Sequence, residues 1–167
     1  RGLGDVYKRQ PGCSEHYLLH VLRGTSAFVP RLDVVALLDG RVVGNAVCLK
    51  SSLKTDDGKE YEVLTLGPIS VLPQYQRKGI GGRMIEYLKT EARDMGFRAI
   101  LLCGDPDYYL RQGFVTAERL GIRSSDDMYV TALHVCELYE GALKGIEGRY
   151  FEDAAYEIDE TAAARFD

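Results

Sequence analysis

Apolar side chains recur along this chain with two different periods, and each period predicts one kind of element. Residues 15–23 carry Leu18, Leu19 and Leu22 on one helical face, and Ser14 is placed to cap the first turn. Residues 83–95 repeat the same spacing with Met84, Ile85, Leu88, Ala92 and Met95. Each segment predicts an amphipathic helix packed on a sheet, and Gly96 is expected to end the second one.

Strands are predicted between and after these helices. Residues 32–38 and 41–50 are joined by Asp39-Gly40, a hairpin turn dipeptide, and a second turn at residues 56–58 leads into residues 60–71. These three segments predict an antiparallel meander. Residues 99–103 form a continuous apolar run that fits a buried parallel strand. Together with the preceding strand and helix, this run is expected to form a right-handed strand–helix–strand crossover unit.

Two further segments modify this pattern. Gly67-Pro68 interrupts the strand over residues 60–71, and a bulge is expected there because proline cannot donate to a strand ladder. Residues 130–137 predict a closing strand, and residues 141–159 predict a less regular tail. The acidic residues of the tail are expected to form a solvated face; they are Glu147, Glu152, Asp153, Glu157, Asp159 and Glu160.

Length and composition fit one α/β domain with a hydrophobic core. The chain has 167 residues and a net charge of −4 that is dispersed, which gives no argument for nucleic acid or an anionic membrane surface. No apolar run approaches the roughly 20 residues that cross a bilayer. The cysteines Cys13, Cys48, Cys103 and Cys136 are scattered, so we expect buried reduced thiols in a cytoplasmic protein.

The segment over residues 71–82 has the character of a phosphate site. It joins a predicted strand to a predicted helix and contains Gly79, Gly81 and Gly82. Glycine lets the backbone approach a ligand closely, and the first amides of a helix favour an anion. Arg77, Lys78 and Arg83 add positive charge around this loop.

The order of the glycines distinguishes between the known phosphate loops. No Lys-Ser or Lys-Thr follows them, as a P-loop requires, and the dinucleotide pattern Gly-x-Gly-x-x-Gly fails at Met84. The run Gln76-Arg77-Lys78-Gly79-Ile80-Gly81 instead resembles the acetyl-coenzyme A loop of the GNAT superfamily of N-acetyltransferases, Gln/Arg-x-x-Gly-x-Gly/Ala. The strand exit Val71-x-Pro73 before it is typical of the same family.

This resemblance implies a fold and a cofactor site. The implied fold is α/β, layered as in α+β proteins, with a mixed central sheet, an antiparallel N-terminal meander, a splayed parallel strand pair and helices on both faces. The implied co-substrate is acetyl-coenzyme A. The backbone of Ile69, Ser70 and Val71 would pair with its pantetheine arm, and the pyrophosphate would be held by Gln76, Arg77, Lys78, Gly79, Ile80, Gly81, Gly82 and Arg83.

Residues 104–114 contain a second match to the family. Asp105 and Pro106 suit the start of a short helix and Gly113 its end. Tyr109-x-x-x-Gly113-Phe114 resembles the GNAT pattern Tyr-x-x-x-Gly-Phe, whose phenol protonates the departing thiolate; a phenol and a thiol have similar pKa values. The resemblance therefore implies that Tyr109 is the general acid and leaves Tyr108 a structural role. The Asn-x-x-Ala that many members carry before this tyrosine is missing here.

The general base is not identified by the sequence. Some family members have a glutamate on the strand before the phosphate loop, but the position that matches by spacing is Thr65, and Glu62 should project to the opposite face. Glu15 or His16 of the first helix, or a water relay, stays open, since this helix borders the acceptor groove in GNAT folds. His16 and His20 share a helical face near Cys13, but a third metal ligand is lacking, so we expect no metal.

The sequence therefore predicts an acetyl-coenzyme A-dependent N-acetyltransferase in which a primary amine attacks the thioester directly in a ternary complex. The acceptor is a small-molecule or protein amine, and the protein is a monomer or homodimer. A catalytically silent coenzyme A-binding module and a protein-interaction domain remain alternatives. Residues 1–10 are expected to be a non-native or disordered leader, residues 11–151 the GNAT domain, and residues 152–167 a C-terminal tail. Residues 141–145 with Tyr150-Phe151 resemble the ending of a bacterial subgroup of predicted GNAT acetyltransferases, and the tail is expected to cover the acceptor groove.

Overall fold

The chain folds into one mixed sheet with helices on both faces. The computed structural model describes the backbone of residues 14–154 and the side chains of residues 18–154. The helices are α1 (Ser14–Arg23), α2 (Ile80–Asp94) and α3 (Pro106–Tyr109), with short 3₁₀ turns η3 (Pro73–Tyr75), η4 (Leu110–Gln112) and η5 (Ala117–Leu120). The strands are β1 (Phe28–Leu38), β2 (Arg41–Thr55), β3 (Glu60–Val71), β4 (Ala99–Cys103), β5 (Val115–Thr116), β6 (Ile122–Arg123), β7 (Leu133–Glu137) and β8 (Gly148–Phe151).

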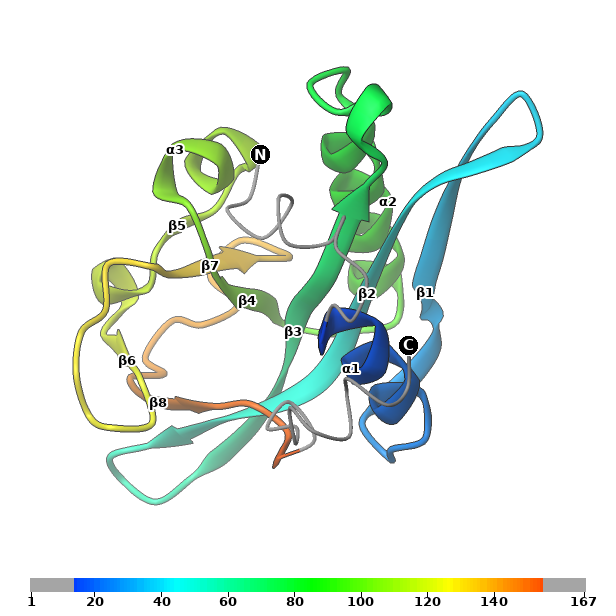
Figure 1. Cartoon of the computed structure of the whole chain (residues 1–167). Coiled ribbons are helices and arrows are strands. Elements are labelled where there is room, and N and C mark those ends of the chain that lie inside the picture. The colour runs from blue at the N-terminus through cyan, green and yellow to red at the C-terminus, as the bar shows by residue number, and fades with distance from the viewer. Residues whose placement is uncertain (1–13, 155–167) are drawn as a thin grey trace.

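The strand order is β5-β7-β4-β3-β2-β8-β6, and β1 also pairs with β2 (Figure 1). The strands β1, β2 and β3 form the predicted antiparallel meander, and β3 and β4 are parallel. Strand β2 is long enough to carry two neighbours on one edge, β1 against its first part and β8 against residues 52–55. This explains why β2 continues to Thr55 although its apolar pattern predicted an end at residue 50.

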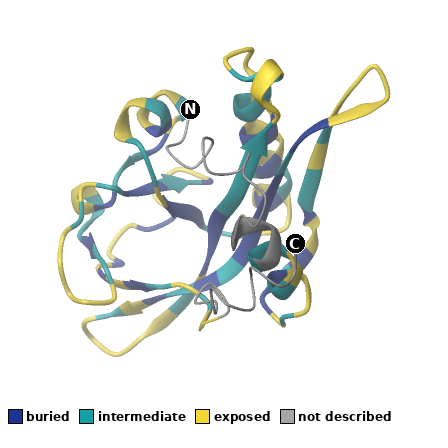
Figure 2. Ribbon diagram, in the orientation of Figure 1, coloured by how far each residue is buried: buried dark blue, intermediate teal, exposed yellow. Residues whose placement is uncertain are grey.

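The alternation of side chains along β2 separates two cores. Ala46 and Cys48 pack with Ile85 and Leu88 of α2 on one face. Val47 and Leu49 pack with Leu22 of α1 on the other face. Helices therefore cover both faces, as predicted, and the tip of the β1–β2 hairpin extends beyond them and is exposed (Figure 2).

The hairpin turn and the bulge that the sequence predicts are both present. Asp39 and Gly40 adopt positive φ values of 51° and 75°, which a tight two-residue hairpin requires. In the β2–β3 ladder Ala46 is opposite Ile69 and Cys48 is opposite Leu66, so two residues of β3, Gly67 and Pro68, lie opposite one residue of β2. The extra residue is a β-bulge, and it reverses which side chains of β3 face α2 beyond that point.

The parallel pair β3–β4 separates immediately after it forms. Its ladder contains only Leu64 opposite Ile100 and Thr65 opposite Leu101. Beyond Thr65, strand β3 stays paired with β2 up to Val71 while β4 ends at Cys103. The carboxyl ends of these strands are therefore splayed, which confirms the predicted gap in the sheet.

Two further boundaries, one additional strand and one thiol differ from the sequence-based expectations. Helix α2 begins at Ile80 rather than residue 83, because the glycines 81 and 82 occupy its first turn, and β7 begins at Leu133 rather than residue 130. The segment predicted as an irregular tail contains β8, since pairing with β2 supplies the partner for its backbone groups. Cys103 is exposed, not buried, because β4 ends there. No helix within residues 14–154 is long and apolar enough to cross a membrane.

Candidate active site

The loop before α2 presents backbone amides in the arrangement expected of an anion site. Gly79 caps the helix in the left-handed conformation with φ 82°, and no side chain caps this end. The amide of Arg83 donates to the Gly79 carbonyl over 3.1 Å. The amides of Ile80, Gly81 and Gly82 precede it and have no acceptor within the helix. These donors lie at the positive end of the helix dipole, so they favour a phosphate group.

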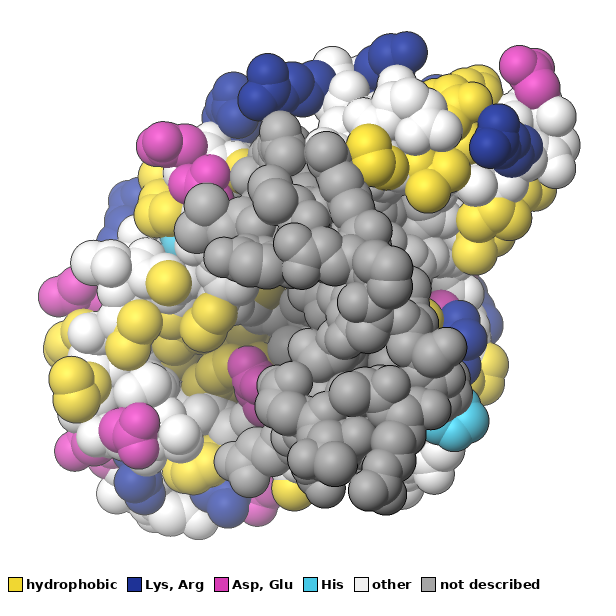
Figure 3. All heavy atoms as spheres, in the orientation of Figure 1, with side chains coloured by type: hydrophobic (Ala, Val, Ile, Leu, Met, Phe, Trp, Pro, Cys, Tyr) yellow, Lys and Arg dark blue, Asp and Glu magenta, His cyan; other side chains and the backbone are white. Residues whose placement is uncertain are grey.

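The three cations predicted around this loop are exposed. Arg77 has a positive φ of 64°, which turns the chain between η3 and α2, and Lys78 Nζ lies 5.7 Å from the Tyr75 ring centre. Arg83 lies one turn into α2 and is exposed. In Figure 3, basic side chains gather along the upper edge of the view, the edge where this loop lies in Figure 1. The charge thus surrounds the helix end.

Gln76 has a structural contact in the loop. Its Nε2 donates to the carbonyl oxygen of Val71 over 2.9 Å. This hydrogen bond therefore links the start of the loop to the end of β3. It also uses the Val71 carbonyl, which faces the gap between β3 and β4.

Only part of the predicted β3 backbone faces the gap. The Leu72 amide donates to the Val43 carbonyl over 2.8 Å, and in an antiparallel ladder every second residue bonds to the same neighbour. Ser70, opposite Asn45, therefore directs its backbone to β2, whereas Ile69 and Val71 direct theirs to the side of β4. A β-carbon built on Gly44 would lie 2.9 Å from the Ser70 carbonyl oxygen, which agrees with this direction. The expectation that Ser70 pairs with the pantetheine arm is corrected: its backbone groups belong to the β2 ladder, and its hydroxyl donates to Asn45 Oδ1.

Tyr109 and Tyr108 have different surroundings at the end of β4. Asp105 caps α3 by accepting a hydrogen bond of 3.0 Å from the amide of Asp107. Tyr109 is 5% exposed and makes an edge contact with Phe114, with ring centres 5.8 Å apart. The Tyr108 hydroxyl oxygen would lie 2.7 Å from a β-carbon built on Gly81, so this tyrosine reaches from α3 to the first turn of α2.

The strand position expected for a base holds a buried threonine. Thr65 is 3% exposed, and its hydroxyl is hydrogen-bonded to that of Tyr150. Glu62 is exposed, and no register shift separates it from Thr65, so the two side chains project to opposite faces as predicted. The side chains of Cys13, Glu15 and His16 lie outside the described residues, and His20 is exposed.

Sequence reasoning missed a cavity at the open end of β4. Its volume is about 300 Å³, and its lining residues are Cys103, Ser124, Ser125, Val130, Leu133, Tyr150, Glu152, Asp153 and Ala154. Glu152 is exposed, as expected of the acidic tail, but partial desolvation at the edge of this cavity raises the pKa of its carboxylate. No local pattern links residues 103 and 152, so only the β2–β8 pairing could have indicated this juxtaposition.

A splayed parallel pair beside a glycine-rich helix N-terminus defines an acyl-coenzyme A-binding fold of the transferase type. Residues 6–114 match the model of the acetyltransferase (GNAT) family, and the chain belongs to that family.

Relatives with similar sequences are bacterial. The N-acetyltransferase YjhQ of Escherichia coli (strain K12) is 33% identical over 86 residues, which cover 51% of this chain and 46% of YjhQ, so the match spans less than half of that relative. The N-acetyltransferase YhbS of the same strain is 26% identical over 136 residues, 81% of this chain and 78% of YhbS.

Two solved structures have the same architecture. Escherichia coli YhbS in complex with CoA superposes with a TM-score of 0.79 at 24% identity, over 91% of this chain and 83% of that one. A GNAT family acetyltransferase from Brucella melitensis in complex with acetyl-CoA gives a TM-score of 0.67 at 28% identity, over 86% and 79% of the two chains. The GNAT fold expected from the sequence is thereby confirmed.

Proposed function

We propose that this protein transfers the acetyl group of acetyl-coenzyme A to a primary amine, which attacks the thioester directly in a ternary complex. The observation that carries the proposal is the splayed end of β3 and β4 beside the uncapped N-terminus of α2. The gap offers backbone groups to a pantetheine arm, and the helix end offers amides to a pyrophosphate. The acetyl-CoA complex of the Brucella melitensis relative supports the same co-substrate.

The proposed roles follow from these positions. The amides of Ile80, Gly81 and Gly82 bind the pyrophosphate, and Arg77, Lys78 and Arg83 neutralise its charge. The backbone of Ile69 and Val71 orients the thioester, so that its carbonyl is held for attack. Tyr109 donates its phenolic proton to the thiolate that leaves. The thiols of Cys48, Cys103 and Cys136 are free, which supports a cytoplasmic location.

Replacing a glycine of the first turn of α2 tests coenzyme binding. A side chain at Gly81 would meet the Tyr108 hydroxyl and narrow the approach to the helix amides. We expect Gly81→Val to weaken acetyl-coenzyme A binding by at least tenfold, about 1.4 kcal/mol, in isothermal titration calorimetry. Gly24→Val is the matched control, because Gly24 lies after α1 with only the Val21 carbonyl near its β-carbon position. Equal affinity in both variants would contradict the proposed site.

Acetyl transfer is tested separately, by thiol release from acetyl-coenzyme A across a panel of small amines and lysine-containing peptides. Amine-dependent release establishes the enzyme. Binding of acetyl-coenzyme A without release for any amine would instead indicate the alternative, a catalytically silent coenzyme A-binding module.

A further inference from the structure

The cavity of about 300 Å³ opens next to the gap, on the face of the sheet opposite α2. Along β4, Ile100 and Leu102 pack in the core that α2 covers, whereas Leu101 packs in the core on the other face. Cys103 follows Leu101 by two residues and therefore projects to the same face as Leu101. Since Leu101 is opposite Thr65 in the last β3–β4 pair, the Cys103 side chain stands where the two strands have just separated. An acceptor in this cavity would reach the gap from the face opposite the coenzyme loop.

Glu152 is the acid best placed to act in this cavity. It follows β8 directly, and within the described residues it has neither a hydrogen-bond nor an ion-pair partner. Partial desolvation raises the pKa of the otherwise exposed Cys103 thiol, and the negative charge of Glu152 raises it further, which agrees with the position of both side chains in one cavity lining. Glu152 is exposed at the opening of the cavity, and partial desolvation of its carboxylate there raises its pKa. A carboxylate without a counterion beside an opening is a binding position for a cation.

The other groups that line the cavity also favour a positively charged ligand. Among the residues that the structure describes, the lining includes two carboxylates, Glu152 and Asp153, and no lysine or arginine. The Tyr150 phenol faces away from bulk water, because it is hydrogen-bonded to Thr65 in the buried floor. The groups around Glu152 are thus a thiol from β4, a phenol and a second carboxylate from β8 and its end, and two serines from one loop. Such a lining attracts an ammonium group and repels a carboxylate.

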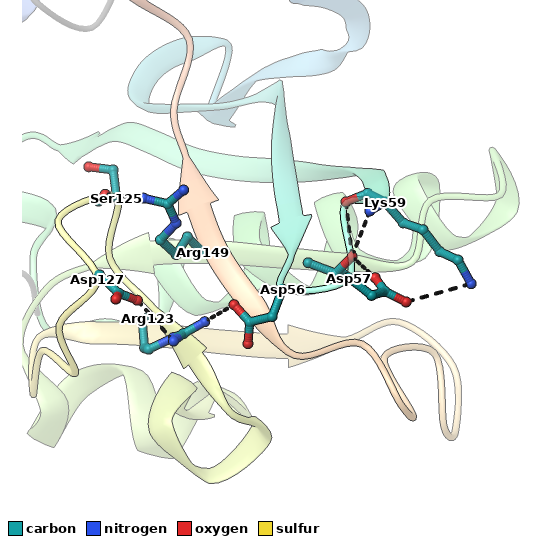
Figure 4. A network of polar contacts seen from close by, with 8 residues as sticks. Asp56, Asp57, Lys59, Arg123, Ser125, Asp127 and Arg149 are labelled. Atoms are coloured by element: carbon teal, nitrogen blue, oxygen red, sulfur yellow. Dashed lines mark hydrogen bonds and ion pairs between the residues drawn. The ribbon is translucent and has the colours of Figure 1, made fainter.

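The loop that contains Ser124 and Ser125 is held by side chains that lie outside the cavity, so the cavity keeps its shape. Arg123 is paired with Asp127 over 2.9 Å and also with Asp56 of the β2–β3 turn (Figure 4). Arg149 Nη1 donates to the Ser125 carbonyl over 3.4 Å (Figure 4). These contacts join β6, β8 and the β2–β3 turn, and they fix the loop that carries Ser124 and Ser125.

We propose that this cavity binds the acceptor as a small aliphatic ammonium ion and that the carboxylate of Glu152 accepts its proton. This inference rests on the proposed function. A cavity of about 300 Å³ is at the lower end of small-molecule sites, which fits a short amine better than a peptide segment. Glu152 then acts as the general base that Thr65 cannot supply.

Each proton and each electron pair in this reaction has a donor and an acceptor. The ammonium ion gives one proton to Glu152, and the lone pair of the neutral amine forms the C–N bond at the thioester carbonyl carbon. The C–S bond breaks with its electron pair on sulfur. Tyr109 gives its proton to the thiolate, the second proton lost by nitrogen replaces it on the phenol, and Glu152 returns its own proton to water. The products are an amide and free coenzyme A.

The experiment compares Glu152→Gln with wild type, using n-butylamine, 1,4-diaminobutane, 4-aminobutanoate and a lysine-containing peptide as probes. We expect the two cationic amines to be acetylated at least tenfold more efficiently than 4-aminobutanoate and the peptide. Glu152→Gln should lower kcat/KM for them by about 10²-fold, the usual size of a general-base contribution, and remove the acidic limb of the pH profile. Glu152→Asp should restore part of the rate, and the affinity for acetyl-coenzyme A should change less than twofold. Glu140→Gln, an equal charge change at an exposed position, is the control.

The outcomes separate the two proposals. A wild-type enzyme that acetylates amines while Glu152→Gln keeps its rate and pH profile overturns the role of Glu152 only. A preference for the peptide or for 4-aminobutanoate overturns the assigned acceptor class. If wild type binds acetyl-coenzyme A but releases no thiol with any amine, the proposed function fails, and the inference fails with it.

Discussion

The hydroxyl groups of Thr65 and Tyr150 are hydrogen-bonded to each other although 85 residues separate them in the chain. Thr65 is the last residue of β3 that pairs with β4, and Tyr150 lies in β8, two strands away in the sheet. The hydrogen bond therefore lies at the point where β3 and β4 separate. It connects the strand that leads to the glycine loop with the strand that precedes Glu152.

Removing one partner of this pair should destabilise the protein. Thr65→Val and Tyr150→Phe each remove this buried hydrogen bond, at a cost of about 1–3 kcal/mol in the free energy of unfolding. The double variant should cost clearly less than the sum, because it leaves no hydroxyl behind. Urea unfolding of the four proteins measures this, and additive losses would contradict a coupled pair.

Tyr109→Phe should reduce acetyl transfer without loss of coenzyme binding. The phenyl ring keeps the edge contact with Phe114, so the fold is retained, while the proton donor is lost. We expect kcat to fall by about 10²-fold with the Kd for acetyl-coenzyme A nearly unchanged. Stopped-flow or steady-state thiol release measures the rate. If Tyr108→Phe shows this loss and Tyr109→Phe does not, the general acid is Tyr108, whose hydroxyl lies beside Gly81.

Arg77→Asn separates charge from backbone conformation in the loop. Asparagine tolerates the positive φ of 64° that Arg77 adopts, so the free energy of unfolding should change by less than about 1 kcal/mol. The lost cation should weaken acetyl-coenzyme A binding by about tenfold at low salt, and less at high salt, where charges are screened. Arg119→Asn on η5 is the control with the same charge change. Titration calorimetry at two salt concentrations decides, and equal affinity of both variants would exclude a phosphate contact of Arg77.

Glu152 should make stability depend on pH in a defined direction. Its pKa is raised in the folded state, so the folded protein binds this proton more tightly than the unfolded chain does. The stability that protonation contributes is complete below the unfolded pKa and is lost as pH rises through the folded pKa. Glu152→Gln should therefore have a higher Tm than wild type near neutral pH, and the difference should vanish at about pH 4, near the ordinary carboxyl value. Calorimetric scans across pH measure this. A Tm difference that persists unchanged at low pH would show that ionisation of Glu152 is not the cause.

The coenzyme half of the site was largely readable from the sequence because its parts are local. A strand, a glycine loop and a helix follow one another over residues 60–94, and turn chemistry and helix periodicity depend on residues a few positions apart. The bulge at Gly67-Pro68 was predictable for the same reason, since proline itself excludes a regular ladder. The family match and the splayed β3–β4 pair confirm the predicted fold around this loop, and the roles of its residues in coenzyme binding stay a prediction.

By itself, the sequence determined the order of the elements, the glycine loop at the start of α2 and the bulge in β3. Only the tertiary structure decided that the backbone of Ser70 is directed to β2, that Thr65 meets Tyr150 and that Glu152 stands beside Cys103. Each of these depends on the register between strands far apart in the chain, and a shift of one residue would turn every side chain to the other face. That register is set by packing on both faces of the sheet, which no local pattern contains.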